Sequence, residues 1–375
     1  MSSTAISMSK RRHDVDWMRT LALGFLILYH LVIAFQPWGG MILFITNKEP
    51  IEWLWPAMGM LNVWRIPLLF LISGMGVGFA MRNRDWVALL GDRAWRLLLP
   101  LAFGFFVICP LYIAMALKWY GLGVRYVPAM GHLWFLANLF AYVVILLPVF
   151  VWFKSDGFQG KLDWIRRRLS FPGWLFLLAV PLALEAWIVE PANFSMYYNS
   201  LHGFLIGMIC FFAGFVAVCL GEAFWNAVGR LRWIALGGAL GLYGVRLFVW
   251  EMQGVHFVTA IESTCWMLAI VGFSSLYLNR SSRALSYLSA AVYPVYIVHM
   301  PVQYALSFVI MPLAIPAVAK LVLLLVGTFA GCFALYEILR RIPLLRPFFG
   351  MKWKRKKAAP ILDTTSSRKE VSLAS

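Results

Sequence analysis

Long apolar segments occupy most of the chain. Segments of about 19–26 residues with few charges lie at 17–36, 56–81, 97–117, 131–153, 172–190, 201–220, 232–250, 257–278, 285–310 and 314–338. An apolar helix of about 20 residues crosses the hydrocarbon core of a bilayer. Hydrophobic residues make up 62% of the sequence and charged residues 13%, a balance that a soluble domain with a polar surface does not have. We therefore predict an all-α polytopic integral membrane protein with about ten transmembrane helices.

The basic residues between these segments indicate how the helices are oriented. Of the 33 lysines and arginines, 27 lie in the N-terminal segment, in the C-terminal tail and in every second loop, whereas the other loops hold only Lys48, Lys118 and Arg125. Loops rich in Lys and Arg stay in the cytoplasm, so both termini are predicted to be cytoplasmic. Topology thus accounts for the net charge of +17, and we expect no nucleic-acid partner.

The remaining features define the ends of the chain and exclude several activities. We expect a cytoplasmic N-terminal segment at 1–15 that leads into a retained signal anchor, a membrane domain at 16–346, and a basic, disordered cytoplasmic tail at 347–375. The five cysteines are scattered without CxxC spacing, so neither a disulfide framework nor a metal site is expected. The sequence contains no HExxH, GxSxG or Walker motif, which leaves proteolysis, esterase-type hydrolysis and ATP-driven work without support.

Three ionisable residues share one face of the first predicted helix. Asp16, Arg19 and His30 are spaced by 3 and 11 residues, and eleven residues at about 100° each return to within roughly 20° of the starting direction. The rise from Arg19 to His30 is about 16 Å, which puts Arg19 at the cytoplasmic surface and His30 in the outer half of the membrane. Ionisable residues inside a bilayer are costly and often functional. The same three residues also fit an interfacial Asp–Arg pair with one core histidine.

Other polar residues in or near the spans also have two interpretations, one functional and one that requires no function. Arg65 lies near the outer end of the second segment and is able to snorkel to the surface. Arg93 and Arg96 are one turn apart at the end of a cytoplasmic loop from 82 to 96, and this spacing suits bidentate phosphate binding. The positive-inside bias also supplies arginines there. Further polar side chains that could line a cavity are Trp134, Glu262, Tyr296 and His299.

Six sequence blocks follow one another along the chain. They are Asp16-x-x-Arg19 with His30 eleven residues later, RIPLLFLISG at 65–74, DRAWRLLLP at 92–100, HLWFLANL at 132–139, YPVYIVHMPV at 293–302 and ALYEILRRIPLLR at 334–346. Together they resemble the motifs of the membrane-bound acyltransferase family 3 over nearly all of residues 16–346. The resemblance extends to the branch that succinylates osmoregulated periplasmic glucans, a branch with ten predicted helices.

The resemblance implies an O-acyltransferase of the bacterial inner membrane. Such an enzyme moves an acyl group, of which succinyl is one candidate, from cytosolic acyl-CoA to a hydroxyl of a periplasmic glucan or another surface carbohydrate. Acyl-CoA is then the donor substrate, and no bound cofactor is expected. The expected partners are membrane lipid, the carbohydrate acceptor and, as candidates, other glucan biosynthesis proteins.

The site residues follow from combining this resemblance with the helical geometry. We expect His30 to act as general base because a neutral imidazole accepts a proton near pH 7, with Asp16 and Arg19 beside it. The phosphates of CoA are expected to be held by Arg93, Arg96 and Arg19. Candidate substrate-binding residues are Arg65, Trp134, Glu262, Tyr296 and His299. The alternative is a proton-coupled transporter or flippase of an anionic solute, in which the buried His, Arg and Glu relay protons.

Overall fold

Helices build the whole of the described structure. The computed structural model describes residues 11–353 apart from residues 83 and 253, and no strand occurs among these residues. The all-α prediction is confirmed. Residues 1–10 and 354–375, which include most of the N-terminal segment and most of the tail expected to be disordered, lie outside the described residues. The α-helices are α1 (His13–Ile33), α2 (Trp55–Met81), α3 (Trp86–Phe103), α4 (Cys109–Trp119), α5 (Trp134–Phe153), α6 (Asp156–Arg168), α7 (Ala179–Val189), α8 (Leu201–Leu220), α9 (Glu222–Phe248), α10 (His256–Tyr277), α11 (Arg283–Ile310) and α12 (Ala317–Leu339).

The helices are long and apolar enough for a polytopic membrane protein. Within the described residues, nine helical stretches meet the length and composition of a membrane span. They correspond to the expected segments except the one at 232–250, which forms the second half of α9. This 27-residue helix carries Arg232 and Arg246, and the two arginines lower its mean hydropathy.

Two regions expected to be loops are helical. Helix α3 begins at Trp86, not near residue 97, because the side chain of Asp85 accepts a hydrogen bond from the backbone N–H of Ala88 at 2.7 Å and caps the helix. Arg93 and Arg96 therefore lie on a helix and not in a loop, and the helical stretch runs on to Trp119. The basic connection after α5 also forms a helix, α6, whose last turn holds three arginines, where positive charge is favourable.

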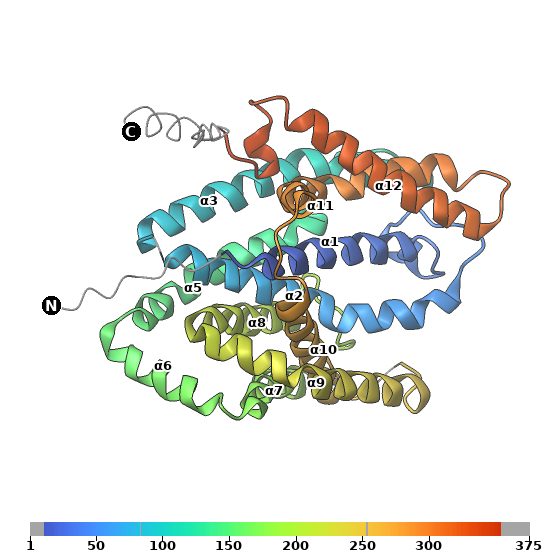
Figure 1. Ribbon diagram of the computed structural model, residues 1–375. Coiled ribbons are helices and arrows are strands. Elements are labelled where there is room, and N and C mark those ends of the chain that lie inside the picture. Colours follow the sequence, from blue (N-terminus) through green and yellow to red (C-terminus); the bar gives the residue numbers. More distant parts are fainter. Residues whose placement is uncertain (1–10, 83, 253, 354–375) are drawn as a thin grey trace, which may run out of the picture.

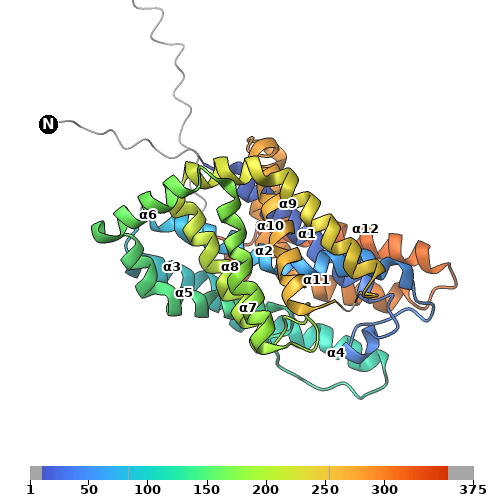
Figure 2. The same cartoon turned by 90° about the horizontal axis from the view of Figure 1, so that it is seen from below.

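Helices α1 and α2 lie at the centre of the bundle. Figure 1 shows them between α3, α11 and α12 on one side and α7 to α10 on the other. Helix α1 packs against α2, α10, α11 and α12, and α2 packs against α8 and α10. The view in Figure 2 shows α9 running beside α10. Polar side chains on the inner faces of α1 and α2 are therefore enclosed by protein.

Small residues fix how closely α2 approaches α8. A Cβ atom added at Gly74 would lie 1.8 Å from the carbonyl oxygen of Phe211, and one added at Gly214 would lie 1.9 Å from the carbonyl oxygen of Leu71. Close backbone contact through small residues is the usual way in which membrane helices pack. The glycines thus hold α2, and the polar residues on it, at a fixed position in the bundle.

Candidate functional site

A basic cavity opens at one end of the bundle. Its volume is about 1000 Å³, and it lies between α1, α2, α3, α5, α11 and the residues that follow α12. In the described structure, Asp16 is the only carboxylate in its lining. The basic side chains that line the cavity are Arg11, Arg19, Arg93, Arg96, Arg340, Arg346 and Lys352. We call this end of the molecule the basic end; seven cations against one carboxylate favour a ligand with several negative charges.

Two of the predicted site residues lie close to the cavity lining along their helices. The lining includes Leu26 on α1, Leu69 on α2 and Tyr296 on α11. His30 stands one helical turn beyond Leu26, and Arg65 one turn beyond Leu69. His30 and Arg65 thus lie about one helical turn from residues of the cavity lining, although they do not line the cavity themselves.

His30 meets His299 across the contact between α1 and α11. The Nδ1 atom of His30 lies 3.0 Å from Nε2 of His299, and the two rings are nearly parallel, with 5° between their planes. The other nitrogen of His299, Nδ1, lies 2.6 Å from the carbonyl oxygen of Tyr296. His30 is half-buried, whereas His299 is fully buried.

These contacts select one tautomer for each ring when both are neutral. A carbonyl oxygen only accepts hydrogen bonds, so Nδ1 of His299 carries the hydrogen and its Nε2 is an acceptor. Nδ1 of His30 must then carry a hydrogen and donate it to His299. The lone pair of His30 is left on Nε2, and this is the tautomer that a general base at this position requires.

Prolines inside the helices create acceptors for the side chains around this pair. A proline lacks an N–H group, so the carbonyl four residues before it loses its helical donor. In α11, Pro301 frees the carbonyl of Ile297, which lies 3.1 Å from Nε2 of His132. The hydroxyl of Tyr296 donates to the carbonyl of His132 at 2.5 Å. The segment before α5 is therefore attached to α11 through both the ring and the backbone carbonyl of His132.

Prolines free a backbone carbonyl in the same way in α3 and α2. In α3, Pro100 frees the carbonyl of Arg96, which accepts a hydrogen bond from the hydroxyl of Tyr293 at 2.8 Å. In α2, Pro67 frees the carbonyl of Val63, which accepts hydrogen bonds from Tyr197 at 3.0 Å and from Ser263 at 2.9 Å. Each proline thus connects its own helix to another element, and two of the three connections border the site.

Arg65 is a buried cation with few partners. Its side chain is 3% exposed, and its Nη2 atom donates to Asn62 Oδ1 at 3.0 Å. The guanidinium lies 3.9 Å above the ring of Tyr29, whose hydroxyl accepts a hydrogen bond from Asn62. The Nε and Nη1 atoms have no hydrogen-bond partner. A buried guanidinium in this state is strongly favoured to bind an anion.

The arginines at the basic end are placed around the cavity mouth. Arg93 donates from Nη2 to the carbonyl of Gly76 at 3.2 Å, and its Nε has no partner. Arg96 forms an ion pair of 3.2 Å with Asp92. The expected pair of Asp16 with Arg19 is present at 3.6 Å. Asp16 is nevertheless closer to Arg11, at 2.7 Å, and it lies at the mouth of the cavity, not beside His30.

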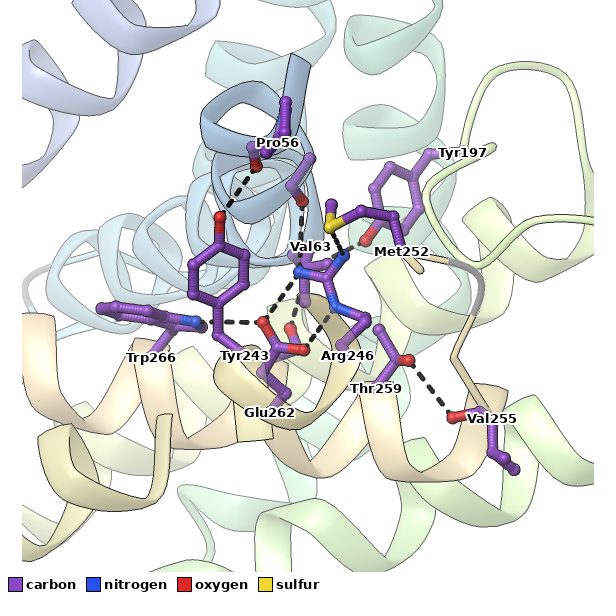
Figure 3. A network of polar contacts seen from close by, with 12 residues as sticks. Pro56, Val63, Tyr197, Tyr243, Arg246, Met252, Val255, Thr259, Glu262 and Trp266 are labelled. Carbon is purple, nitrogen blue, oxygen red and sulfur yellow. Dashed lines mark hydrogen bonds and ion pairs between the residues drawn. The ribbon is translucent and has the colours of Figure 1, made fainter. Parts of the chain in front are cut away.

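Five of the candidate residues do not line the cavity of the described structure: His30, Arg65, Trp134, Glu262 and His299. Trp134 packs edge-on against Phe70 and Tyr198. Glu262 forms a bidentate ion pair with Arg246, at 2.7 and 2.9 Å, and also accepts from the indole of Trp266 at 3.3 Å. Figure 3 shows this network on α9 and α10. The structure thus places Arg19, Arg93, Arg96 and Tyr296 in one cavity lining, and the His30–His299 pair lies about one helical turn away along α1 and α11. Glu262 belongs to a separate ion pair.

Several residues around the site were not among those expected from the sequence. His132, Tyr293 and Tyr29 contact the predicted residues, and Arg340, Arg346 and Lys352 add charge to the cavity. The prolines of the spans signal that carbonyls are free, but the sequence does not say which side chain reaches them. No group of three His, Cys, Asp or Glu side chains suited to a metal ion occurs in residues 11–353 as described.

A comparison with protein families gives one match. A family model described as an acyltransferase domain matches residues 12–337, a range that includes both histidines of the pair. Neither the comparison with curated proteins nor the comparison with solved structures finds a match.

Proposed function

Because the chain belongs to the acyltransferase 3 family and is a membrane acyltransferase, we propose that it moves an acyl group from cytosolic acyl-CoA to a hydroxyl of a periplasmic glucan or another surface carbohydrate. Its place would be the bacterial inner membrane. The positive-inside pattern assigns the basic end to the cytoplasm, where acyl-CoA is made. The acceptor would approach from the opposite side.

The observation that supports this proposal most strongly is the basic cavity, whose lining comes within about one helical turn of the histidine pair. Acyl-CoA carries its phosphates at one end and its thioester at the end of a long flexible arm. The cavity has seven cations at its mouth and apolar residues such as Leu26 and Leu69 farther in. Charge-assisted hydrogen bonds from Arg93, Arg96 and Arg19 would hold the phosphates, and the arm would extend toward His30.

In the proposed reaction, His30 acts as the general base. Its Nε2 takes the proton from the acceptor hydroxyl as the hydroxyl oxygen attacks the thioester carbon. The tetrahedral intermediate then collapses, the carbon–sulfur bond breaks, and the CoA thiolate leaves and takes up the proton from His30. His299 contributes by accepting the hydrogen of His30 Nδ1, which keeps the lone pair on Nε2.

Arg65 would stabilise negative charge in this reaction. Its Nε and Nη1 atoms have no partner, and preorganised donors without a partner are suited to the oxyanion of a tetrahedral intermediate. If the acyl group is succinyl, the same two donors could instead hold its free carboxylate. A bidentate arrangement on a carboxylate is the geometry that a guanidinium favours.

Transfer by the purified protein tests the proposal. Protein in detergent is incubated with succinyl-CoA or acetyl-CoA and with periplasmic glucan, and both CoA release and the mass of the glucan are measured. We expect CoA release that depends on the glucan and a mass increment that identifies the acyl group. Mass spectrometry of glucans and surface polysaccharides from cells with and without the protein identifies the acceptor.

The transporter alternative predicts a different result. A proton-coupled transporter or flippase would take up an anionic solute into proteoliposomes in response to a pH gradient and would release no CoA. Uptake without acyl transfer would therefore contradict the proposal.

A further inference from the structure

The residues after α12 form part of the cavity wall. The last regular element, the 3₁₀ helix η6 (Arg346–Phe349), follows the end of α12 by a short turn, and the described chain continues to residue 353. Arg340, Arg346 and Lys352 all line the cavity. The sequence predicted a tail from residue 347 onward; the structure describes residues 347–353 of it, of which 347–349 belong to η6.

Aromatic and apolar packing holds this segment in place. The rings of Phe348 and Phe349 lie 5.1 and 5.5 Å from the ring of Phe103 on α3. Pro347 and Phe349 are buried. These contacts bury apolar surface between η6 and α3, which gives the segment a fixed position against the helix that carries Arg93 and Arg96.

Gly350 completes the attachment. Its φ angle is +69°, in the left-handed region that glycine adopts without strain. A Cβ atom at this position would lie 1.6 Å from Cδ1 of Tyr293, so the chain passes directly over the tyrosine ring. Tyr293 in turn donates to the carbonyl of Arg96 at 2.8 Å. The C-terminal segment, Tyr293 and the turn of α3 that holds Arg96 are therefore one packed unit.

The segment points positive charge at the cavity. The Nε and Nη2 atoms of Arg346 both donate to the carbonyl of Arg340, at 3.0 and 2.5 Å, which orients the guanidinium at the mouth. Lys352 is exposed and also lines the cavity. Arg341, the neighbour of Arg340, has a side chain that is 77% exposed and is not part of the cavity lining.

From these contacts we propose that residues 340–352 are a binding element for the nucleotide end of the donor, with Arg346 and Lys352 contacting phosphate at the cavity mouth. This inference rests on the proposed use of acyl-CoA. It assigns to the chain a second group of phosphate-binding residues, in addition to Arg93 and Arg96, contributed by residues that follow the family-matched region, which ends at 337.

Equilibrium binding of unacylated CoA to the detergent-purified full chain tests the inference. We expect Arg346→Gln and Lys352→Gln each to weaken CoA binding by about 3- to 10-fold at low ionic strength, with a smaller effect in high salt because salt screens exposed charges. Arg341→Gln is the matched control, since it removes an equal charge a few residues away, and its CoA affinity should equal that of wild type. Arg346→Lys should recover only part of the loss because an ammonium does not bind phosphate bidentately.

The outcomes separate this inference from the proposed function. Binding of CoA by wild type with unchanged affinity in Arg346→Gln and Lys352→Gln would overturn the inference and leave the proposed donor intact. An equal loss in all three glutamine variants would also overturn it, because general surface charge would then explain the effect. Failure of wild type to bind CoA would contradict the proposed donor and this inference together. Lys352 is exposed, so its glutamine variant should fold and still tests the inference if Arg346→Gln does not fold.

Discussion

Arg65 and Arg246 are equally buried but have different surroundings. Their side chains are 3% and 4% exposed. Arg246 donates from two nitrogens to both oxygens of Glu262. Arg65 has one side-chain acceptor, the amide of Asn62, and two nitrogens without a partner. An ion pair in which both partners have their hydrogen bonds is a structural contact. A buried cation that lies near a cavity and has donors without a partner is available to a ligand.

Two histidines, His202 and His30, repeat this difference. His202 lies between the carboxylate of Glu185, at 2.9 Å, and the carbonyl of Phe194, at 2.8 Å, so both of its ring nitrogens are used. The ring of His30 has one hydrogen bond in the described structure, to His299. In both comparisons the residue paired with a carboxylate uses all of the groups compared, whereas Arg65 and His30 each keep a ring or guanidinium nitrogen without a hydrogen-bond partner among the described residues.

The largest expected effect is the loss of activity in His30→Ala. A general base typically contributes about 10²–10⁴-fold in rate, and the alanine leaves no buried charge without a partner, so protein abundance should stay near that of wild type. The rate of acyl transfer at saturating donor is the measurement. Retention of more than about a tenth of the wild-type rate would remove His30 from the catalytic role.

His202→Ala is the control for that experiment. The substitution leaves Glu185 buried without its partner, and breaking a buried ion pair costs about 3–5 kcal/mol. We expect a lower melting temperature in detergent and less folded protein. If His30→Ala and His202→Ala lowered stability alike, the distinction between the two histidines would be wrong.

Substitutions of Arg65 and Arg246 are expected to separate effects on stability from effects on activity. Arg246→Met should destabilise the protein by about 3–5 kcal/mol because Glu262 loses its partner, and Arg246→Met combined with Glu262→Met should recover most of that loss. Arg65→Met removes a buried charge that has no carboxylate partner, so the melting temperature should stay the same or rise. Its rate of transfer should fall by about 10²–10³-fold if Arg65 stabilises the oxyanion.

Acyl groups of different charge show which role Arg65 has. With succinyl-CoA and acetyl-CoA as donors, an oxyanion role predicts that Arg65→Met loses a similar factor with both. A carboxylate-binding role predicts a selective loss with succinyl-CoA. A strongly destabilised Arg65→Met variant would show that Arg65, like Arg246, serves the fold.

His299 should have an intermediate effect. His299→Phe keeps a ring but removes the acceptor for His30 Nδ1–H, and losing a buried hydrogen-bond partner costs about 1–3 kcal/mol. We expect the rate at saturating donor to fall by about 10- to 100-fold while the apparent affinity for the donor stays unchanged. His299→Gln, whose amide oxygen is able to accept the same hydrogen, should recover part of the rate. Equal rates in the two variants would argue that packing, and not the tautomer, explains the effect.

The sequence predicted the spans much better than the contacts between them. Helix α8 begins and ends where the apolar segment at 201–220 does, because an uninterrupted apolar run in a bilayer has to satisfy its own backbone. The start of α3 was missed because its first turns are charged and amphipathic, and hydropathy alone does not detect them. The sequence predicted residues 347–353 as part of a basic tail. Their position depends on contacts with Phe103 and Tyr293, which are distant in the sequence and which no local pattern indicates.

The sequence proposes residues for the site but does not indicate how they are arranged. The spacing on the first helix and the family resemblance pointed to Arg19 and His30; Arg19 lines the cavity, and His30 lies one helical turn beyond the lining residue Leu26. The contact of His30 with His299 joins residues 269 positions apart. It depends on how α1 packs against α11, which no local pattern encodes. Glu262 was expected at the site because it is ionisable and buried, but burial alone does not distinguish a ligand-binding carboxylate from one paired with Arg246.

The smallest expected effect concerns Arg93 and Arg96, whose presence the positive-inside bias alone could explain. If Arg93 and Arg96 only orient the membrane helices, lysine at either position keeps the charge and changes nothing, because the positive-inside rule depends on charge and not on guanidinium geometry. Arg93 has an Nε without a partner, and both side chains line the cavity. If they grip phosphate bidentately, lysine is a poor substitute. Arg93→Lys and Arg96→Lys should then weaken the apparent affinity for acyl-CoA by about tenfold, which corresponds to about 1.4 kcal/mol, with a smaller effect on the rate at saturating donor.

Arg84 provides the matched control for this last comparison. It lies just before α3, pairs with Asp92 at 3.2 Å and is not part of the cavity lining, so Arg84→Lys should leave the dependence of transfer on donor concentration unchanged. The decisive result is how the three lysine variants rank in donor affinity. A purely electrostatic effect of the basic end would be the same for Arg84→Lys, Arg93→Lys and Arg96→Lys. Unchanged donor affinity in Arg93→Lys and Arg96→Lys, with normal protein levels, would place both arginines with the saturated, structural groups of the molecule. In that case other cations of the cavity would have to hold the phosphates of the donor, and the candidates are Arg19, Arg346 and Lys352.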